Sequence, residues 1–231
     1  MSDALLSTRA LCVGYSGRAI LPAIDLTVRS GELWVVAGRN GSGKTTWIKT
    51  LLGLLEPVSG SVRHERPGLK LAYLGQRQEL EAHYPVAVKD VVGLGTLREN
   101  RWFSGRAQRR RRILRALELT GASELAEQPF SELSEGQKQR VLLARIQASD
   151  CALAVLDEPT SAMDAGAEES AWQLLKTVQR ESSLSLLVVT HALELARKYA
   201  DRVLRFDRER RELSAGGVEL LGEYAAHGTR P

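Results

Sequence analysis

The sequence predicts an α/β protein in which a sheet of mostly parallel strands carries an inserted helical segment. Short apolar runs alternate with helical patterns on both sides of a mainly helical stretch at about residues 77–148. Parallel strands are buried on both faces and are therefore apolar throughout, as Leu33–Ala37 and Ala152–Leu156 are. With 231 residues, the chain has the size of one large domain.

The individual elements follow from periodicity and from helix-breaking residues. A glycine-rich turn separates the first apolar run from a helical pattern, which Glu56-Pro57 ends. In the middle, Ala107–Leu119 is the clearest helix, with Ile113 and Leu117 on one face and Arg109–Arg112 around the rest. In chain order we expect strand Leu33–Ala37, helix Thr45–Leu55, strand Leu69–Leu74, helix Ala107–Leu119, strand Ala152–Leu156, helix Ala167–Arg180, strand Leu184–Thr190, helix Ala192–Ala200 and strand Arg202–Phe206.

Composition excludes several classes of protein. Apolar residues make up 43% of the chain and charged residues 26%, which is typical of a globular protein and not of a fibre or a disordered chain. The apolar runs are too short to span a bilayer, and Met1–Leu11 lacks the pattern of a signal peptide. Cys12 and Cys151 have neither metal-ligand spacing nor the number for a disulfide scaffold. We therefore expect a reducing, cytoplasmic setting.

Positive charge is concentrated in one segment. The net charge is +4, yet Arg98–Arg115 holds eight arginines and one glutamate, a local +7 that leaves −3 for the remainder. A single basic segment and 5% aromatic residues do not indicate a nucleic-acid partner. The segment is either a solvated helix face or a surface for a membrane or for acidic protein loops.

A phosphate-binding loop stands between the first strand and the first helix. Its residues match the pattern G-x-x-x-x-G-K-[ST]. Glycines allow successive backbone N–H groups to point at phosphate oxygens, and the following helix adds the positive end of its dipole. Lys44 is expected to reach the β- and γ-phosphates and Thr45 to hold Mg²⁺. The loop consists of Gly38, Arg39, Asn40, Gly41, Ser42, Gly43, Lys44 and Thr45.

Two adjacent carboxylates follow a second apolar strand. Asp157 ends the run Ala152–Leu156, where a carboxylate can support Mg²⁺. Glu158 comes next and is placed to polarise a water for attack on the γ-phosphate. With the upstream loop, these residues predict hydrolysis of a nucleoside triphosphate. No N-K-x-D motif for guanine is present, so GTP is disfavoured.

A third motif identifies the kind of protein. Leu133–Gln137 contains Ser134-x-x-Gln137, a capping box that predicts the start of a helix. Together with the motifs above, it resembles the nucleotide-binding subunit of ABC transporters over Tyr15 to about Phe206. Seven resemblances follow the order of the family. Tyr15 resembles the aromatic residue that stacks on adenine, Gly38–Thr45 the Walker A loop, Gln76 the Q-loop glutamine and Leu133–Gln137 the signature motif. Leu153–Glu158 resembles the Walker B strand, Ser161–Asp164 the D-loop and His191 the switch histidine.

The resemblance implies a fold and a division of the chain. It implies one ABC ATPase domain over residues 1–231, with a P-loop NTPase sheet and an N-terminal antiparallel β portion. The nucleotide-binding core would comprise 1–76 and 149–231. The inserted helical subdomain, 77–148, would carry the signature motif.

The resemblance also implies the roles of the site residues. The active form would be a head-to-tail dimer that encloses two MgATP. Catalysis would depend on Lys44, Gln76, Glu158 and His191, and Mg²⁺ would be held by Thr45, Gln76 and Asp157. Nucleotide contacts would come from Tyr15, the loop Gly38–Thr45, Thr46, Ser134, Gly136, Gln137 and Asp164.

One signature position departs from the family pattern. Glu135 stands where glycine is usual. A carboxylate in the first turn of a helix is stabilising by roughly 0.3–1 kcal/mol, but near a triphosphate it is repulsive. If its side chain points to solvent, activity survives, whereas if it points at the nucleotide, the ATP-bound dimer is weakened. We expect an active ATPase.

The segment Tyr84–Gly95 resembles the same region in importers of metal ions and metal chelates. The segment Arg101-Trp102-Phe103 resembles the zinc and manganese branch, and siderophore or haem importers are nearly as similar. The chain would then couple ATP-driven closure to integral-membrane permease subunits, with a substrate-binding protein, at the cytoplasmic face of the inner membrane. An exporter subunit and a soluble ABC-type ATPase in iron–sulfur assembly are the alternatives.

Overall fold

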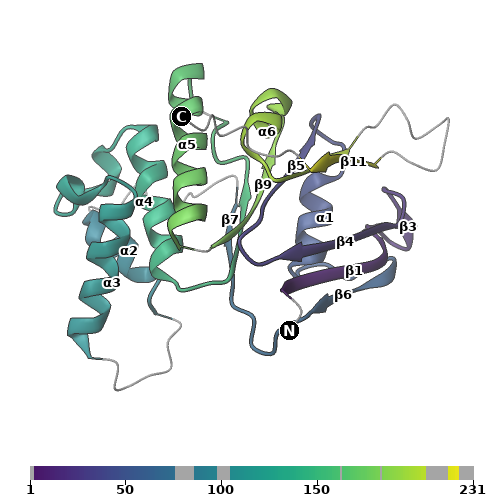
Figure 1. Cartoon of the computed structure of the whole chain (residues 1–231), viewed down its shortest axis with the longest axis horizontal. Helices are drawn as coiled ribbons and strands as arrows, with labels where there is room; N and C mark the ends of the chain where they lie inside the picture. Colours follow the sequence, from purple (N-terminus) through teal and green to yellow (C-terminus); the bar gives the residue numbers. More distant parts are fainter. Residues whose placement is uncertain are drawn as a thin grey trace, which may run out of the picture.

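A computed structural model of the chain describes residues 3–75, 86–97, 105–161, 163–182 and 184–206, and the backbone of 218–223. An antiparallel sheet lies at one end, a mainly parallel sheet lies in the middle, and a group of helices lies at the other end (Figure 1). The predicted α/β fold class, with an antiparallel β portion and helices, is confirmed.

The central sheet has six strands in the order β11-β10-β5-β9-β8-β7. All neighbours pair in parallel except β11, which runs antiparallel to β10. The strands β5, β8 and β9 are buried in nearly every residue because both faces of the sheet are covered. The bounds are β5 (Leu33–Gly38), β7 (Leu71–Leu74), β8 (Leu153–Asp157), β9 (Ser185–Thr190), β10 (Arg202–Phe206) and β11 (Val218–Glu223).

Alternate residues of each strand pack against different helices. On β5, Trp34 and Val36 join the cluster around α1 (Lys44–Leu51), whereas Val35 joins the cluster of α5 (Ala165–Ser182) and α6 (Leu193–Tyr199). This alternation is the period of two that strands impose on their side chains. Because the strands are parallel, the loops that follow β5, β8 and β9 leave the sheet at one edge.

The antiparallel sheet covers α1 from the outside. Its order is β4-β1-β6, and β4 alternates between buried and exposed or half-buried residues. The buried residues of β1 and β4 enter the same cluster as α1. A short hairpin of β2 (Gly14–Tyr15) and β3 (Arg18–Ala19) follows β1. The other bounds are β1 (Ala4–Cys12), β4 (Ile24–Arg29) and β6 (Ser59–His64).

Three helices form a separate apolar cluster: α2 (Val88–Leu94), α3 (Arg106–Leu119) and α4 (Glu135–Ala148). Short 3₁₀ turns at Ser123–Leu125 and Phe130–Glu132 connect α3 to α4. Two arginines of α3 bind neighbouring backbone: Arg109 Nη2 donates to Gly93 O at 3.2 Å and Arg112 Nη2 to Ala148 O at 2.5 Å. No helix within the described ranges is long and apolar enough to cross a bilayer.

Two sequence expectations need correction. The first helix ends at Leu51 and not at Leu55, because Gly53 adopts a left-handed φ of 71° that terminates it. The sequence predicts no strand beyond Phe206, but Val218–Glu223 forms β11. An edge strand is held by backbone pairing, so its sequence needs no continuous apolar run.

Candidate active site

The loop between β5 and α1 is shaped by positions that tolerate no side chain. A Cβ on Gly38 would lie 2.6 Å from Phe206 O and 2.8 Å from Ser42 Oγ. Gly43 has a φ of 102°, which L-residues rarely adopt, and caps α1. The intervening Arg39, Asn40 and Gly41 are exposed. The loop therefore opens to solvent directly above the N-terminus of α1, where the helix dipole favours an anion.

The side chain of Lys44 is buried at the base of this loop. Its Nζ donates to Gly38 O at 2.7 Å and to Arg39 O at 3.1 Å, and it lies 3.8 Å from Glu158 Oε1. Burial lowers the pKa of Lys44, while the charges of Glu158 and Asp157 act in the opposite direction. The ammonium group thus has two carbonyl partners that phosphate oxygens could replace.

Asp157 collects two hydroxyl groups on one carboxylate oxygen. Thr45 Oγ1 and Tyr73 Oη each donate to Asp157 Oδ2 at 3.4 Å. Burial raises the pKa of Asp157, with a further contribution from the adjacent charge of Glu158. A threonine hydroxyl next to a carboxylate is an oxygen donor set that suits Mg²⁺, which prefers oxygen ligands and retains several waters.

Glu158 is held in an unusual backbone conformation at the end of β8. Its φ is 51°, in the left-handed region that costs a non-glycine residue roughly 1–2 kcal/mol. Its N–H donates to Val189 O at 3.0 Å, which fixes the turn against β9. The same strand leads to His191, which is exposed one residue after β9 ends. Such strain is typical of functional positions.

An aromatic side chain stands beside the loop helix. Tyr15 lies in the β2–β3 hairpin and is 55% exposed. Its Oη is 3.0 Å from Thr46 Oγ1, so the ring is tied to the residue that follows Thr45. An exposed ring with one fixed end can serve as a stacking surface for a planar ligand.

A buried hydroxyl group in the loop indicates whether a phosphate group would fit there. Ser42 Oγ is buried and has no hydrogen-bond partner among the described residues. Buried hydroxyl groups are nearly always partnered. A phosphate oxygen above the loop would satisfy this group, and the Lys44 ammonium and the Thr45 and Asp157 oxygens complete a set of donors that fits a magnesium-bound triphosphate.

The signature segment begins helix α4 as the capping box predicts. Gln137 N donates to Ser134 Oγ at 3.3 Å, and Ser134 N donates to Gln137 Oε1 at 2.9 Å. Glu135 is 58% exposed and accepts from Lys138 Nζ at 2.9 Å. The carboxylate that departs from the family pattern is thus paired with a lysine one turn further along the helix.

A cavity of about 690 Å³ opens beside this helix start. It lies between the end of α3, the first turn of α4 and the first turns of α5, and Ser134, Gly136 and Gln137 line it. No residue of the loop 38–46 is in its lining. The phosphate loop and the signature segment therefore face different spaces within one chain.

The turn after Glu158 is fastened to the start of α5. Thr160 Oγ1 donates to Glu168 Oε1 at 2.9 Å, and Asp164 Oδ1 accepts from Ala167 N at 2.9 Å. Met163 lines the cavity beside α4. These two contacts attach the residues that follow the carboxylates to the first turn of α5.

The structure brings together four of the predicted residues from two loops, because Lys44 contacts Glu158 and Thr45 contacts Asp157. His191 lies in a third loop, one residue after β9 ends. Gln76 lies outside the described residues. Sequence reasoning missed Tyr73, whose strand ends shortly before Gln76, and Glu168. The sequence does place Tyr73 on the strand before Gln76, which hints at a role near the site. Its contact with Asp157, however, depends on the pairing of β7 with β8.

Comparison with known proteins gives the same assignment. A family model described as ABC transporter matches residues 21–161. The zinc import ATP-binding protein ZnuC of Yersinia enterocolitica is 34% identical and covers 87% of this chain and 75% of its own. ZnuC of Pseudomonas entomophila is also 34% identical and covers 97% of this chain and 86% of its own.

Solved structures share the whole fold. A transporter assigned to the metal-chelate type, in an inward-facing conformation, has a TM-score of 0.82 at 25% identity, over 96% of this chain and 84% of that one. The cbiO1 protein of Clostridium perfringens, part of the cbiONQ complex, has a TM-score of 0.79 at 25% identity, over 88% and 85%. The chain belongs to the ABC transporter family, as one of its ATP-binding subunits.

Proposed function

We propose that this chain hydrolyses ATP to energise import of a metal ion, with zinc as the leading substrate. The observation that carries the proposal is the convergence of Lys44, Asp157 and Glu158 beneath the phosphate loop. The zinc import relatives and the metal-chelate transporter support metal as cargo. The metal would pass through a membrane partner and would not contact this chain.

The reaction needs few groups. The loop N–H groups, Ser42 and Lys44 would bind the phosphates, with Tyr15 stacked on adenine and Thr46 below. Thr45, Asp157 and Gln76 would hold Mg²⁺, which would supply positive charge to neutralise the charge that develops on the phosphates. Glu158, 3.8 Å from Lys44 Nζ, would then lie near the γ-phosphate.

Glu158 would act as the general base. Its carboxylate accepts a proton from water as the water oxygen bonds to the γ-phosphorus, while the bond to the β–γ bridging oxygen breaks and ADP leaves. His191, exposed at the end of β9, would contact the γ-phosphate. The fixed turn at Glu158 supports this role because a base must be held in place before the reaction.

The second half of each site would come from another copy of the chain. Ser134, Gly136, Gln137 and Asp164 stand apart from the loop that would hold the phosphates. A head-to-tail dimer would bring the start of α4 to the γ-phosphate of the partner. A similar bacterial ABC transporter cassette was solved as a dimer, with a TM-score of 0.70 at 25% identity over 87% of this chain and 94% of that one.

The remaining assignments follow from family membership. Subunits of this kind work as dimers with membrane permeases, and we place this chain at the cytoplasmic face of the inner membrane, with a substrate-binding protein in the same system. We assign residues 1–76 and 149–231 to the nucleotide-binding core and 77–148 to a helical subdomain of the same domain.

The test of the function is Glu158→Gln. The amide cannot accept the proton of water, so we expect ATP turnover and metal uptake to fall roughly 10²–10⁴-fold while MgATP still binds and holds the dimer closed. Steady-state ATPase assays and uptake of radioactive zinc measure the two effects. Glu127→Gln, an exposed carboxylate paired with Lys89, is the matched control. Turnover at the normal rate would refute the role of Glu158.

The pair Glu135–Lys138 predicts how the signature tolerates a carboxylate. In the Glu158→Gln background, Lys138→Gln leaves the charge of Glu135 unpaired, and we expect MgATP-dependent dimerisation to weaken about two- to fivefold, the size of an exposed ion pair. Glu135→Gln/Lys138→Gln should restore it. Sedimentation measures the dimer dissociation constant, and equal constants for the single and double variants would contradict the prediction.

Tyr73 is predicted to position the carboxylate of Asp157. Removing a hydrogen bond to a metal ligand typically weakens metal affinity, so Tyr73→Phe should raise the Mg²⁺ concentration for half-maximal ATPase about tenfold. ATP binding in EDTA should not change. Tyr199→Phe, whose hydroxyl contacts Glu169 instead, is the control. An unchanged Mg²⁺ requirement would remove this role from Tyr73.

A further inference from the structure

Helix α3 concentrates positive charge that its own sequence does not offset. It contains six arginines and one glutamate, and the glutamate stands in the last turn. Arg111 and Arg115 are exposed and four residues apart, so their like charges are neighbours on the helix surface. Such pairs destabilise a helix slightly. The folding of α3 therefore gives no reason for this charge.

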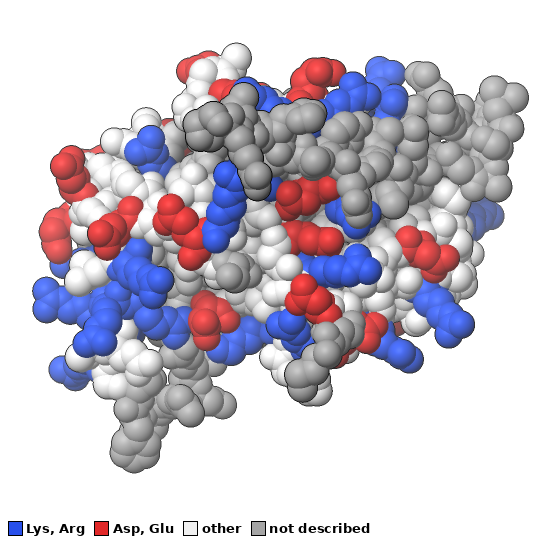
Figure 2. Space-filling view, viewed as in Figure 1, with Lys and Arg blue, Asp and Glu red and all other residues white. Residues whose placement is uncertain are grey.

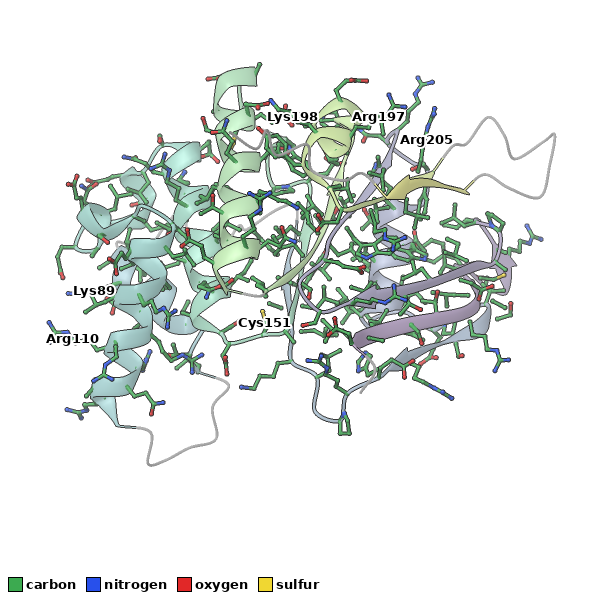
Figure 3. All side chains as sticks on the ribbon, in the orientation of Figure 1. Lys89, Arg110, Cys151, Arg197, Lys198 and Arg205 are labelled. Carbon is green, nitrogen blue, oxygen red and sulfur yellow. The ribbon has the colours of Figure 1, made fainter. Side chains whose placement is uncertain are left out.

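Only part of the charge has a structural use. Arg109 and Arg112 donate to backbone carbonyls of α2 and α4, which attaches α3 to its neighbours. Arg110 points outward from the helix, as Lys89 does from α2 (Figure 3). Lysine and arginine side chains gather over the end of the molecule where α3 lies (Figure 2). This leaves Arg110, Arg111 and Arg115 on an outer basic face.

An exposed apolar side chain shares that surface, and two more stand at the end of α2. Leu114 is 52% exposed and follows Arg110 by four residues, so it belongs to the same outer strip. Leu94 and Leu97 are 47% and 63% exposed at the end of α2. They follow Gly93, whose carbonyl oxygen accepts from Arg109 on α3. Leu114 thus lies among the outer arginines, whereas Leu94 and Leu97 follow the residue that contacts the α2-facing side of α3.

We propose that this surface, called here the α3 surface (Arg110, Arg111, Leu114 and Arg115), binds anionic lipid headgroups of the membrane. The proposal extends the proposed function, which places the chain at a membrane. Arginines pair with phosphate groups of lipids, and their long stems let leucines between them enter the interface.

The shape of the surface favours a lipid layer over an acidic peptide. A peptide that binds as a helix or a strand uses a groove or a sheet edge, whereas these arginines stand on the convex side of a helix. The cavity beside α3 lies at its other end, at Glu118–Gly121, and is lined by α4 and α5. A flat anionic layer can contact all three arginines and Leu114 together.

Vesicle flotation tests the proposal with the purified full chain. Vesicles of phosphatidylcholine alone are compared with vesicles that also contain anionic phosphatidylglycerol, at low and high salt. We expect binding only to the anionic vesicles, with loss at high salt. The variant Arg110→Gln/Arg111→Gln/Arg115→Gln should bind about 100-fold more weakly, at about fivefold for each arginine.

The matched control removes the same charge elsewhere. Arg9→Gln/Arg63→Gln/Arg197→Gln changes three exposed arginines outside α3 and should bind the anionic vesicles like the unmodified chain. Equal losses in the two triple variants, or no preference for anionic vesicles, would overturn the proposal. So would loss of permease copurification by the α3 variant without any vesicle binding by the unmodified chain, since that result indicates an acidic protein partner.

ATP hydrolysis measured on the same samples separates the two proposals. The α3 variant should hydrolyse ATP in solution at the normal rate because its changes are remote from Lys44 and Glu158. An inactive but vesicle-binding chain would count against the proposed function alone. An active chain that ignores vesicles would count against the lipid surface alone.

Discussion

The buried ammonium group of Lys44 is the interaction around which the rest of the site is organised. It sits beneath a loop whose curve requires glycine at positions 38 and 43, and it lies between two carbonyl oxygens and the carboxylate of Glu158. Burial lowers the pKa of Lys44, so an anion that compensates its charge would stabilise the ammonium form. Because β5, β8 and β9 run parallel, their carboxyl ends lie at one edge of the sheet, where the loops of the site begin.

The distance between two anion-binding elements explains why the chain would act in pairs. The loop before α1 and the capped start of α4 both present helix N-termini, yet the cavity at α4 includes no residue of the loop. In the proposed dimer, a single copy would therefore contribute to two shared sites. Pairing Glu135 with Lys138 keeps the start of α4 close to neutral, which is compatible with a triphosphate arriving from another copy.

Local patterns predicted much of this from sequence. Apolar runs located the buried strands because parallel strands show no alternation, and the Ser134–Gln137 spacing located the start of α4 because a capping box is a local structure. Contacts that depend on strand pairing could not be predicted. Tyr73 reaches Asp157 only because β7 pairs with β8, and β11 is formed by backbone pairing with β10 that leaves little trace in its sequence. The use of Arg109 and Arg112 as backbone donors likewise depends on how the helices pack.

The most direct test of the account is ATP binding by the Lys44→Ala variant, measured by calorimetry beside the unmodified chain, with thermal unfolding as the check on folding. Removing the ammonium group leaves the phosphates without their buried cation. A charge-assisted contact contributes about 1.5–3 kcal/mol, so we expect ATP affinity to fall roughly 10- to 100-fold in a folded protein. Equal affinity in the two proteins would show that ATP does not use this loop, and the assignment of the site would be wrong.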